Sequence, residues 1–190
     1  MEDIEIEIQV KIENAKLLLE FLEKNAKFKY ENRQVDEYFS PAHRDFTSLR
    51  PIKEWLRLRN SDGKYSVTYK SFYYDSDGKS THADEYELSI DKIDQMKKIF
   101  GALDFKSVTT VNKARKAWNY KDWEIVMDNI EGLGDFVEIE YKGNGNVDPK
   151  ETTSEMVKFL KDIGCGKVER NYVGYPFQLM FPEEVKFEEQ

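Results

Sequence analysis

The chain has 190 residues, of which 39% are hydrophobic, 14% aromatic and 35% charged, and its formal net charge is −8. This length favours a single domain over residues 1–190 with a substantial core, and the aromatic content argues against disorder. The acidic balance disfavours nucleic acid as a partner, and the single cysteine excludes a disulfide framework or a zinc site of several thiolates.

The first predicted element is a strand, because polar and apolar residues alternate strictly over residues 5–12. Side chains two positions apart on a strand share a face. One face therefore carries only polar side chains: Glu5, Glu7, Gln9 and Lys11. A helix is predicted next over residues 13–25, where apolar residues follow a helical spacing and Asn14 is a suitable N-cap.

The same periodicities predict the later elements. Strands are expected at residues 27–39, 55–59, 65–73, 84–90, 105–118, 123–130, 136–142 and 167–172. Asn60 to Gly63 marks a hairpin turn, and two further helices are expected near residues 91–100 and 153–163. The aromatic segment from Tyr172 to Phe181 is interpreted as a flap or a packing strand. There is no apolar run of membrane-spanning length and no recognisable signal peptide, so we expect a cytoplasmic protein without a membrane partner.

These elements predict an α+β fold in which an eight-stranded antiparallel sheet closes into a barrel with flanking helices. Many antiparallel strands remove their edges by closing, and eight strands leave an interior that can hold a small ligand. The charged strand faces would then line the interior, and helices would cover part of the outward apolar faces.

Paired charges recur on the later strands with a two-residue spacing. They are Arg57 with Arg59, Glu85 with Glu87, Lys113 with Arg115, and Glu138 with Glu140. Taken singly, such a pair is more often a solvated strand face. Together they collect charges of both signs on one side of the sheet. Arginine and lysine bind phosphate oxygens and carboxylates bind hard divalent cations, so the pattern indicates a polyanion site with metal ligands.

Seven motifs in chain order resemble the CYTH superfamily, the triphosphate tunnel metalloenzymes. Glu5-Ile6-Glu7 is similar to the start of the family's ExExK motif, and residues 56–59 are similar to its LRxR strand. The other similarities are Thr68-Tyr69-Lys70 to TxK, residues 84–87 to the acidic strand, Lys113-Ala114-Arg115 to KxR, Asp128 to the strand aspartate, and residues 134–140 to GxFxExE.

The resemblance implies a metal-dependent enzyme whose partner is a small-molecule triphosphate. The implied triphosphate ligands are Lys11, Arg57, Arg59, Lys70, Lys113, Arg115 and Arg170. Among these, the implied catalytic residues are Lys70, Lys113 and Arg115. The implied cofactor is Mg²⁺ or Mn²⁺, and its ligands would be Glu5, Glu7, Asp128, Glu138 and Glu140. Cyclase relatives are often dimers, so a homodimer is also an expectation.

Two positions depart from the family pattern. Gln9 stands where the motif has its lysine, and Lys11 lies one step further along the same strand face as a substitute. The arginine that usually opens the acidic strand is replaced within residues 80–83. Both departures remove positive charge, so the affinity for triphosphate or the choice of substrate could differ from that of better-known members.

Three functions remain open on this evidence. The first is a class IV adenylyl cyclase-like lyase that converts ATP to cyclic AMP and pyrophosphate. The chain length, the DxYF segment at residues 36–39 and the turn at residues 130–134 favour it. The second is a triphosphatase that hydrolyses thiamine triphosphate, tripolyphosphate or another organic triphosphate. The third is a non-catalytic triphosphate- or polyphosphate-binding module, which the departures at Gln9 and Ala83 leave open.

Overall fold

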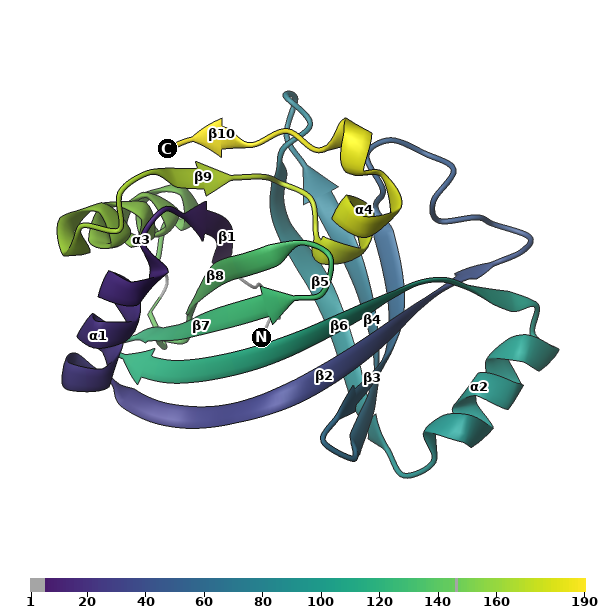
Figure 1. The fold of residues 1–190 in the computed structure, drawn as a ribbon. Coiled ribbons are helices and arrows are strands. Elements are labelled where there is room, and N and C mark those ends of the chain that lie inside the picture. Colours follow the sequence, from purple (N-terminus) through teal and green to yellow (C-terminus); the bar gives the residue numbers. More distant parts are fainter. Residues whose placement is uncertain (1–5, 146) are drawn as a thin grey trace. The chain divides into compact units, whose positions relative to one another are not determined.

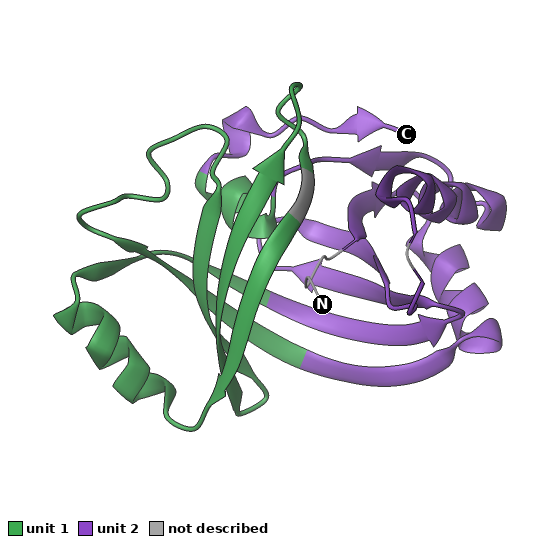
Figure 2. Ribbon diagram, turned by 180° about the vertical axis from the view of Figure 1, so that it is seen from behind, with its two compact units in different colours: residues 1–5, 33–112, 174–180 green, residues 6–32, 113–173, 181–190 purple. Residues whose placement is uncertain are grey.

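The computed structural model describes residues 6–145 and 147–190, without the side chains of residues 81 and 82. The chain divides into two compact units (Figure 2). Of the described residues, unit 1 comprises 33–112 and 174–180, and unit 2 comprises 6–32, 113–173 and 181–190. Strands β2 and β6 each contribute residues to both units.

The described strands form a ten-stranded sheet with the order β10-β9-β1-β8-β7-β6-β2-β3-β4-β5 (Figure 1). Their bounds are β1 Glu7–Ile12, β2 Lys27–Pro41, β3 Glu54–Ser61, β4 Lys64–Tyr74, β5 Ser80–Ile90, β6 Phe105–Tyr120, β7 Trp123–Ile130, β8 Gly134–Tyr141, β9 Val168–Arg170 and β10 Glu188–Glu189. The helices are α1 Ala15–Asn25, α2 Ile93–Ala102, α3 Pro149–Ile163 and α4 Tyr175–Met180.

The predicted α+β class is confirmed, but the prediction of eight strands closed into a barrel needs correction. The described sheet has ten strands, and its order ends at β10 and β5 without closing. A strand has two edges, and the described part of β1 uses both, pairing antiparallel with β8 and with β9. The C-terminal strands thus occupy the edge of β1 that a closure would need.

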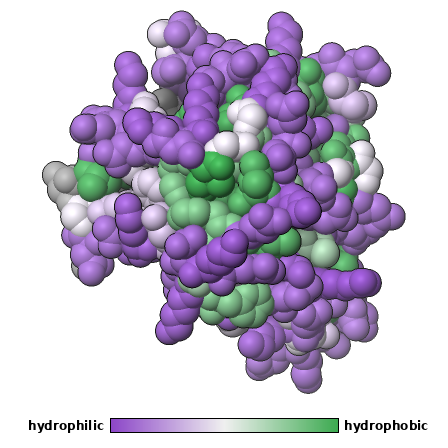
Figure 3. Space-filling model, turned by 60° about the vertical axis from the view of Figure 1, so that its left-hand side comes forward, coloured by the Kyte–Doolittle hydropathy of each residue, from purple (hydrophilic) through white to green (hydrophobic). Residues whose placement is uncertain are grey.

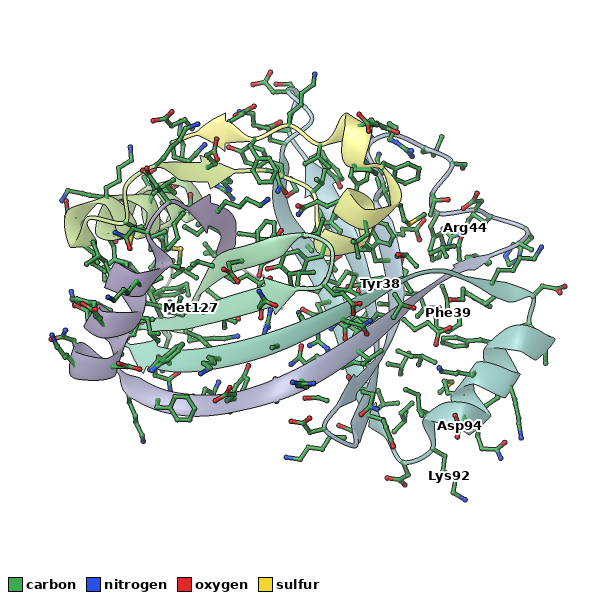
Figure 4. All side chains as sticks on the ribbon, viewed as in Figure 1. Tyr38, Phe39, Arg44, Lys92, Asp94 and Met127 are labelled. Carbon is green, nitrogen blue, oxygen red and sulfur yellow. The ribbon has the colours of Figure 1, made fainter. Side chains whose placement is uncertain are left out.

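In unit 1, successive side chains of β2 point alternately to an apolar face and to a polar face of the sheet. Tyr38 and Phe39 are consecutive residues of this strand (Figure 4). Phe39 packs edge-to-face on Phe100 of α2, with ring centroids 5.1 Å apart, in an apolar cluster that includes Leu58. Tyr38 packs on Trp55, with centroids 5.5 Å apart, on the opposite face of the strand. Helix α2 therefore covers the apolar face and leaves the polar face of β2 to β5 for other contacts.

In unit 2, helices α1 and α3 lie side by side against the apolar face of the sheet (Figure 1). Ile8 and Val10 of β1 are fully buried there with Leu18 of α1 and Leu160 of α3. The predicted N-cap is confirmed, because the Asn14 side chain accepts a hydrogen bond from the backbone N–H of residue 17.

A hollow of about 600 Å³ opens between α1, α3 and the turn that joins β6 to β7. Figure 3 brings this side forward and shows an apolar area bordered by hydrophilic side chains. The apolar side chains of the hollow are Leu17, Phe21, Tyr120, Trp123, Phe159 and Ile163. Charged side chains of α1 and α3, among them Glu20 and Lys158, also line the hollow, whereas the alternating charged residues of β1, β7 and β8 belong to the other face of the sheet.

Two predicted elements differ from the structure. The third helix begins at Pro149 rather than at residue 153, because Asp148 caps it by accepting from the backbone N–H of Glu151. The aromatic segment expected to be a flap or strand instead contains α4, in which Tyr175 and Phe177 are buried. No helix in the described part of the chain is both long and apolar enough to cross a membrane.

Candidate functional site

In unit 1, one face of strands β2 to β5 carries a continuous set of polar and charged side chains. Residues that lie directly opposite each other in neighbouring strands point to the same side of a sheet. The pairs on this face are Asp36–Arg59, Tyr38–Arg57, Thr68–Glu87 and Lys70–Glu85. The two predicted arginines and Lys70 therefore lie on one face of the sheet.

A buried carboxylate, Asp36, holds Arg59 in two-point geometry. Its oxygens accept hydrogen bonds from Arg59 Nε and Nη2, each at 2.7 Å. Arg57 Nη1 lies 3.7 Å from the same carboxylate, whose side chain is only 1% exposed. A charge so far removed from water needs paired cations, and here the two guanidinium groups supply them. Asp36 thus fixes the orientation of the Arg59 guanidinium plane.

Arg57 lies at the centre of this face. Its Nη2 donates to Thr68 Oγ1 at 3.0 Å and lies 3.5 Å from a Glu87 oxygen. Burial acts to lower the pKa of the Arg57 guanidinium, but the attraction of Asp36 and of the other carboxylates is stronger, and the net pKa is raised. Arg57 is therefore a permanent cation on this face.

Lys70 completes the set of cations in unit 1. Its Nζ lies 3.0 Å from Glu85 Oε2, and Glu85 Oε1 lies 3.8 Å from Arg57 Nη2. The two glutamates of β5 thus form salt bridges with these cations. Each cation on this face therefore has a carboxylate partner.

In unit 2, the corresponding charged face is built on β1, β8, β7 and β6. The cross-strand pairs on this face are Glu7–Glu140, Gln9–Glu138 and Arg115–Asp128. Arg115 Nε donates to Asp128 Oδ1 at 2.7 Å, and Arg115 Nη2 contacts both Asp128 and Glu138. Lys113 Nζ lies 3.8 Å from the fully buried Asp128 carboxylate. Each unit thus clamps one arginine with a buried aspartate of the neighbouring strand.

The predicted metal ligands are arranged in two ways. Glu7 lies directly opposite Glu140, a like-charge pair that is unfavourable without a cation. Lys142 Nζ lies 2.5 Å from Glu140, and Gln9 Nε2 donates to Glu138 at 3.1 Å. Among the described residues, no group of three or more His, Cys, Asp or Glu side chains is gathered as a metal site. The oxygen-only donor set nevertheless has the chemistry that Mg²⁺ and Mn²⁺ prefer.

Two of the predicted metal ligands are not placed in that donor set. Asp128 has both carboxylate oxygens engaged by Arg115, so the structure assigns it an arginine partner. Glu5 lies outside the described residues.

Arg170, a predicted phosphate ligand, does not join the charged face of unit 2. The register places it opposite Val10, which belongs to the buried apolar face of β1. Its guanidinium donates to the backbone carbonyl of Glu7 at 3.3 Å and stacks on Tyr172 at 4.7 Å. Burial lowers the pKa of Arg170, and attraction to Tyr172 and Glu7 opposes this only in part. The sequence could not show this orientation, because it depends on the register between β9 and β1.

Sequence reasoning assigned Asp36 no binding role and missed a second buried carboxylate, Glu124. Lys29 forms an ion pair with Glu124, and Tyr30 donates to the same carboxylate at 3.3 Å. Burial raises the pKa of Tyr30, Arg115 opposes the shift, and Glu124 adds to it. One signal in the sequence could have pointed to Asp36: it lies two residues before Tyr38, so both side chains share a face of β2. The identity of its partner, however, depends on the register between β2 and β3.

The CYTH domain matches residues 3–172, and the chain therefore belongs to the CYTH family. Among relatives, the "Putative adenylate cyclase MJ0240" of Methanocaldococcus jannaschii is 37% identical over 166 residues, which cover 86% of this chain and 91% of that protein.

Solved structures show the same fold. The PH1819 protein of Pyrococcus horikoshii is 28% identical, with a TM-score of 0.74 over 94% of this chain and 99% of that one. HpAC1 from Hippeastrum is 20% identical, with a TM-score of 0.71 over 96% of this chain and 97% of that one. At 20% identity, the second likeness is evidence of the fold alone.

Proposed function

We propose that the protein is a metal-dependent enzyme that acts on a triphosphate and that its reaction is the conversion of ATP to cyclic AMP and pyrophosphate. One observation carries the proposal: on the charged face of each unit, a buried aspartate binds an arginine side chain and fixes its orientation. A guanidinium has five N–H donors, and Asp36 takes two of those of Arg59. An arginine held in this way is preorganised for phosphate oxygens.

The proposed phosphate ligands are the cations of the two faces. They are Arg57, Arg59 and Lys70 of unit 1, and Lys11, Lys113 and Arg115 of unit 2. A triphosphate carries about four negative charges near neutral pH, and these cations would balance that charge. Arg170 is left out of this set because it faces the apolar side of β1.

The proposed cofactor is Mg²⁺ or Mn²⁺, held by Glu7, Glu138 and Glu140. The position of Glu7 directly opposite Glu140 supports this choice, because carboxylate oxygens are the ligands that such a cation prefers. When bound, the metal would neutralise phosphate charge. Asp128 would act through Arg115 rather than as a ligand.

In the proposed cyclase reaction, the ribose 3′-hydroxyl attacks the α-phosphorus and pyrophosphate leaves. The contribution of this chain is to fix the triphosphate and to offset the charge that grows on the leaving group. Lys70, Lys113 and Arg115 are the proposed catalytic residues, since each carries its charge on a rigid strand beside an oriented carboxylate.

A second candidate is the hydrolysis of a triphosphate. HpAC1, which shares the fold, is described as an adenylyl cyclase candidate with a dominant triphosphatase activity. The same charged faces would serve both reactions, because each needs the polyphosphate held and the leaving group stabilised.

The test is incubation with ATP, thiamine triphosphate and tripolyphosphate in the presence of Mg²⁺ or Mn²⁺, with identification of the products. Cyclic AMP with pyrophosphate supports the cyclase, and orthophosphate release supports the hydrolase. Binding without turnover would overturn both in favour of a binding module. Glu138→Ala should reduce turnover, whereas Glu183→Ala, which removes an exposed carboxylate of the same unit, serves as the matched control.

A further inference from the structure

Lys11, two residues after Gln9 on the same strand face, lies over two phenylalanine rings of unit 2. Its Nζ is 4.9 Å from the ring centroid of Phe136 and 4.9 Å from that of Phe187. The two centroids are 6.5 Å apart, and the rings are tilted by 35°. Phe136 is 2% exposed and lies two residues before Glu138 on the same face of β8, so burial holds its ring in place beside the charged residues.

The second ring comes from the C-terminal segment, residues 181–190, beyond the part of the chain that matches the family, which ends at residue 172. This segment is fastened to the sheet, because Glu188 and Glu189 of β10 pair with β9 and the backbone N–H of Gln190 donates to Val168 at 3.0 Å. Strand β9 in turn pairs with β1, the strand of Lys11. The segment therefore holds Phe187 in a fixed position relative to Lys11.

Aromatic rings hold an ammonium group differently from a carboxylate. The attraction comes from the ring quadrupole, so the positive charge is not compensated and the three N–H donors are not consumed by an acceptor. Lys70, by contrast, is paired with Glu85 at 3.0 Å. Glu169 lies opposite Lys11 in the register, but it is paired with Lys167 at 2.7 Å. Across residues 6–145 and 147–190, the structure places no carboxylate within ion-pair distance of Lys11.

We propose that Phe187 is a positioning residue that, together with Phe136, holds Lys11 as an uncompensated cation for the phosphate chain of the substrate. Lys11 thereby replaces the motif lysine whose place Gln9 takes. The proposal rests on the proposed function, because the cation is assigned to a triphosphate. Phe187 itself contacts Lys11 and not the substrate.

A purely structural role predicts something different. If Phe187 only covered the apolar ring of Phe136, then any apolar side chain of similar size would serve, and the charge of Lys11 would not matter. Phe187→Leu keeps the apolar cover but loses the aromatic face, whereas Phe187→Tyr keeps the ring. Lys11→Met keeps the length of the side chain and removes its charge. Lys186→Met removes an exposed charge from the same segment and is the matched control.

The experiment measures tripolyphosphate affinity by calorimetry with Mg²⁺ for these variants and for the Lys11→Met/Phe187→Leu double variant. A cation–π contact of this kind contributes enough that Phe187→Leu should weaken binding by about 3- to 10-fold. Phe187→Tyr and Lys186→Met should stay within about twofold of the unsubstituted protein. The double variant should bind no more weakly than Lys11→Met alone, because each substitution removes the same contact, that between Lys11 and Phe187.

A second readout follows the geometry without any ligand. With ¹³C-labelled lysine, the side-chain methylene protons of Lys11 should show upfield ring-current shifts that Phe187→Leu removes and Phe187→Tyr keeps. Wild-type protein that fails to bind tripolyphosphate would overturn the proposed function, and the ring-current shifts would still test the clamp. Absent shifts overturn the clamp geometry. Normal binding by Phe187→Leu, or additive losses in the double variant, overturns the positioning role.

Discussion

Asp36→Asn tests the central element of unit 1, the buried carboxylate that clamps Arg59. The substitution keeps the size of the side chain but removes its charge and one of its two acceptor oxygens. Arg59 and Arg57 then lose the anion that lies 2.7 Å and 3.7 Å from them. Two guanidinium groups would be left on one face without that anion.

Removal of one partner from a buried ion pair costs about 3–5 kcal/mol of folding free energy. The guanidinium side chains of Arg57 and Arg59 are 13% and 17% exposed, and asparagine still accepts one hydrogen bond, so the lower end applies. We expect a loss of about 3 kcal/mol, which in a chain of this size lowers Tm by about 6–12 °C.

The assay is thermal and urea unfolding with and without tripolyphosphate. Because Asp36 orients Arg59 for phosphate oxygens, the variant should bind tripolyphosphate more weakly, and the ligand should raise the Tm of Asp36→Asn less than that of the unsubstituted protein. Glu37→Gln is the matched control: the neighbouring residue of β2 forms a more exposed ion pair with Lys97, so it should cost less than about 1 kcal/mol. Equal stability of the Asp36 and Glu37 variants would refute the reasoning.

Three further predictions concern other parts of the protein. Arg57→Ala should weaken triphosphate binding by about 1.5–3 kcal/mol in calorimetry, whereas Glu138→Ala should mainly reduce turnover and its dependence on metal. Gln9→Lys should be tolerated or should tighten triphosphate binding, because it adds a cation beside Glu138, which Gln9 now contacts at 3.1 Å. Burial raises the pKa of the Cys165 thiol to about 11, so the unfolded chain loses this proton first and stability should fall as the pH rises from about 9 to 11. Cys165→Ala should make that fall less steep in urea titrations.

Each of these predictions has an outcome that contradicts it. Unchanged affinity in Arg57→Ala would remove this residue from the phosphate ligands. Weaker binding in Gln9→Lys would mean that the glutamine amide itself is needed. If Cys165→Ala lost stability with pH as steeply as the unsubstituted protein, other groups would account for the loss of stability at alkaline pH. Tyr74 is one such group, because burial raises its pKa to about 12.

The sequence by itself determined the local elements and the parity of their faces. Strict alternation placed Gln9 on one side of β1 and Ile8 on the other, and the structure confirms this with Ile8 fully buried. The hairpin between β3 and β4 was also predictable, since Asp62 and Gly63 adopt positive φ angles of 48° and 84°, which the residue types at a tight turn allow. These features depend only on residues close together in the chain.

Tertiary structure alone decided which charges meet. The pairing of Asp36 with Arg59, the turning of Arg170 to the apolar side and the clamping of Lys11 by Phe187 all depend on strand register or on the path of the C-terminal segment. A register shift of one residue would move each side chain to the other face, and no local pattern fixes that choice between distant strands. The same reason explains the failed prediction of closure, because the edge of β1 is taken by β9, a strand more than 150 residues later in the chain.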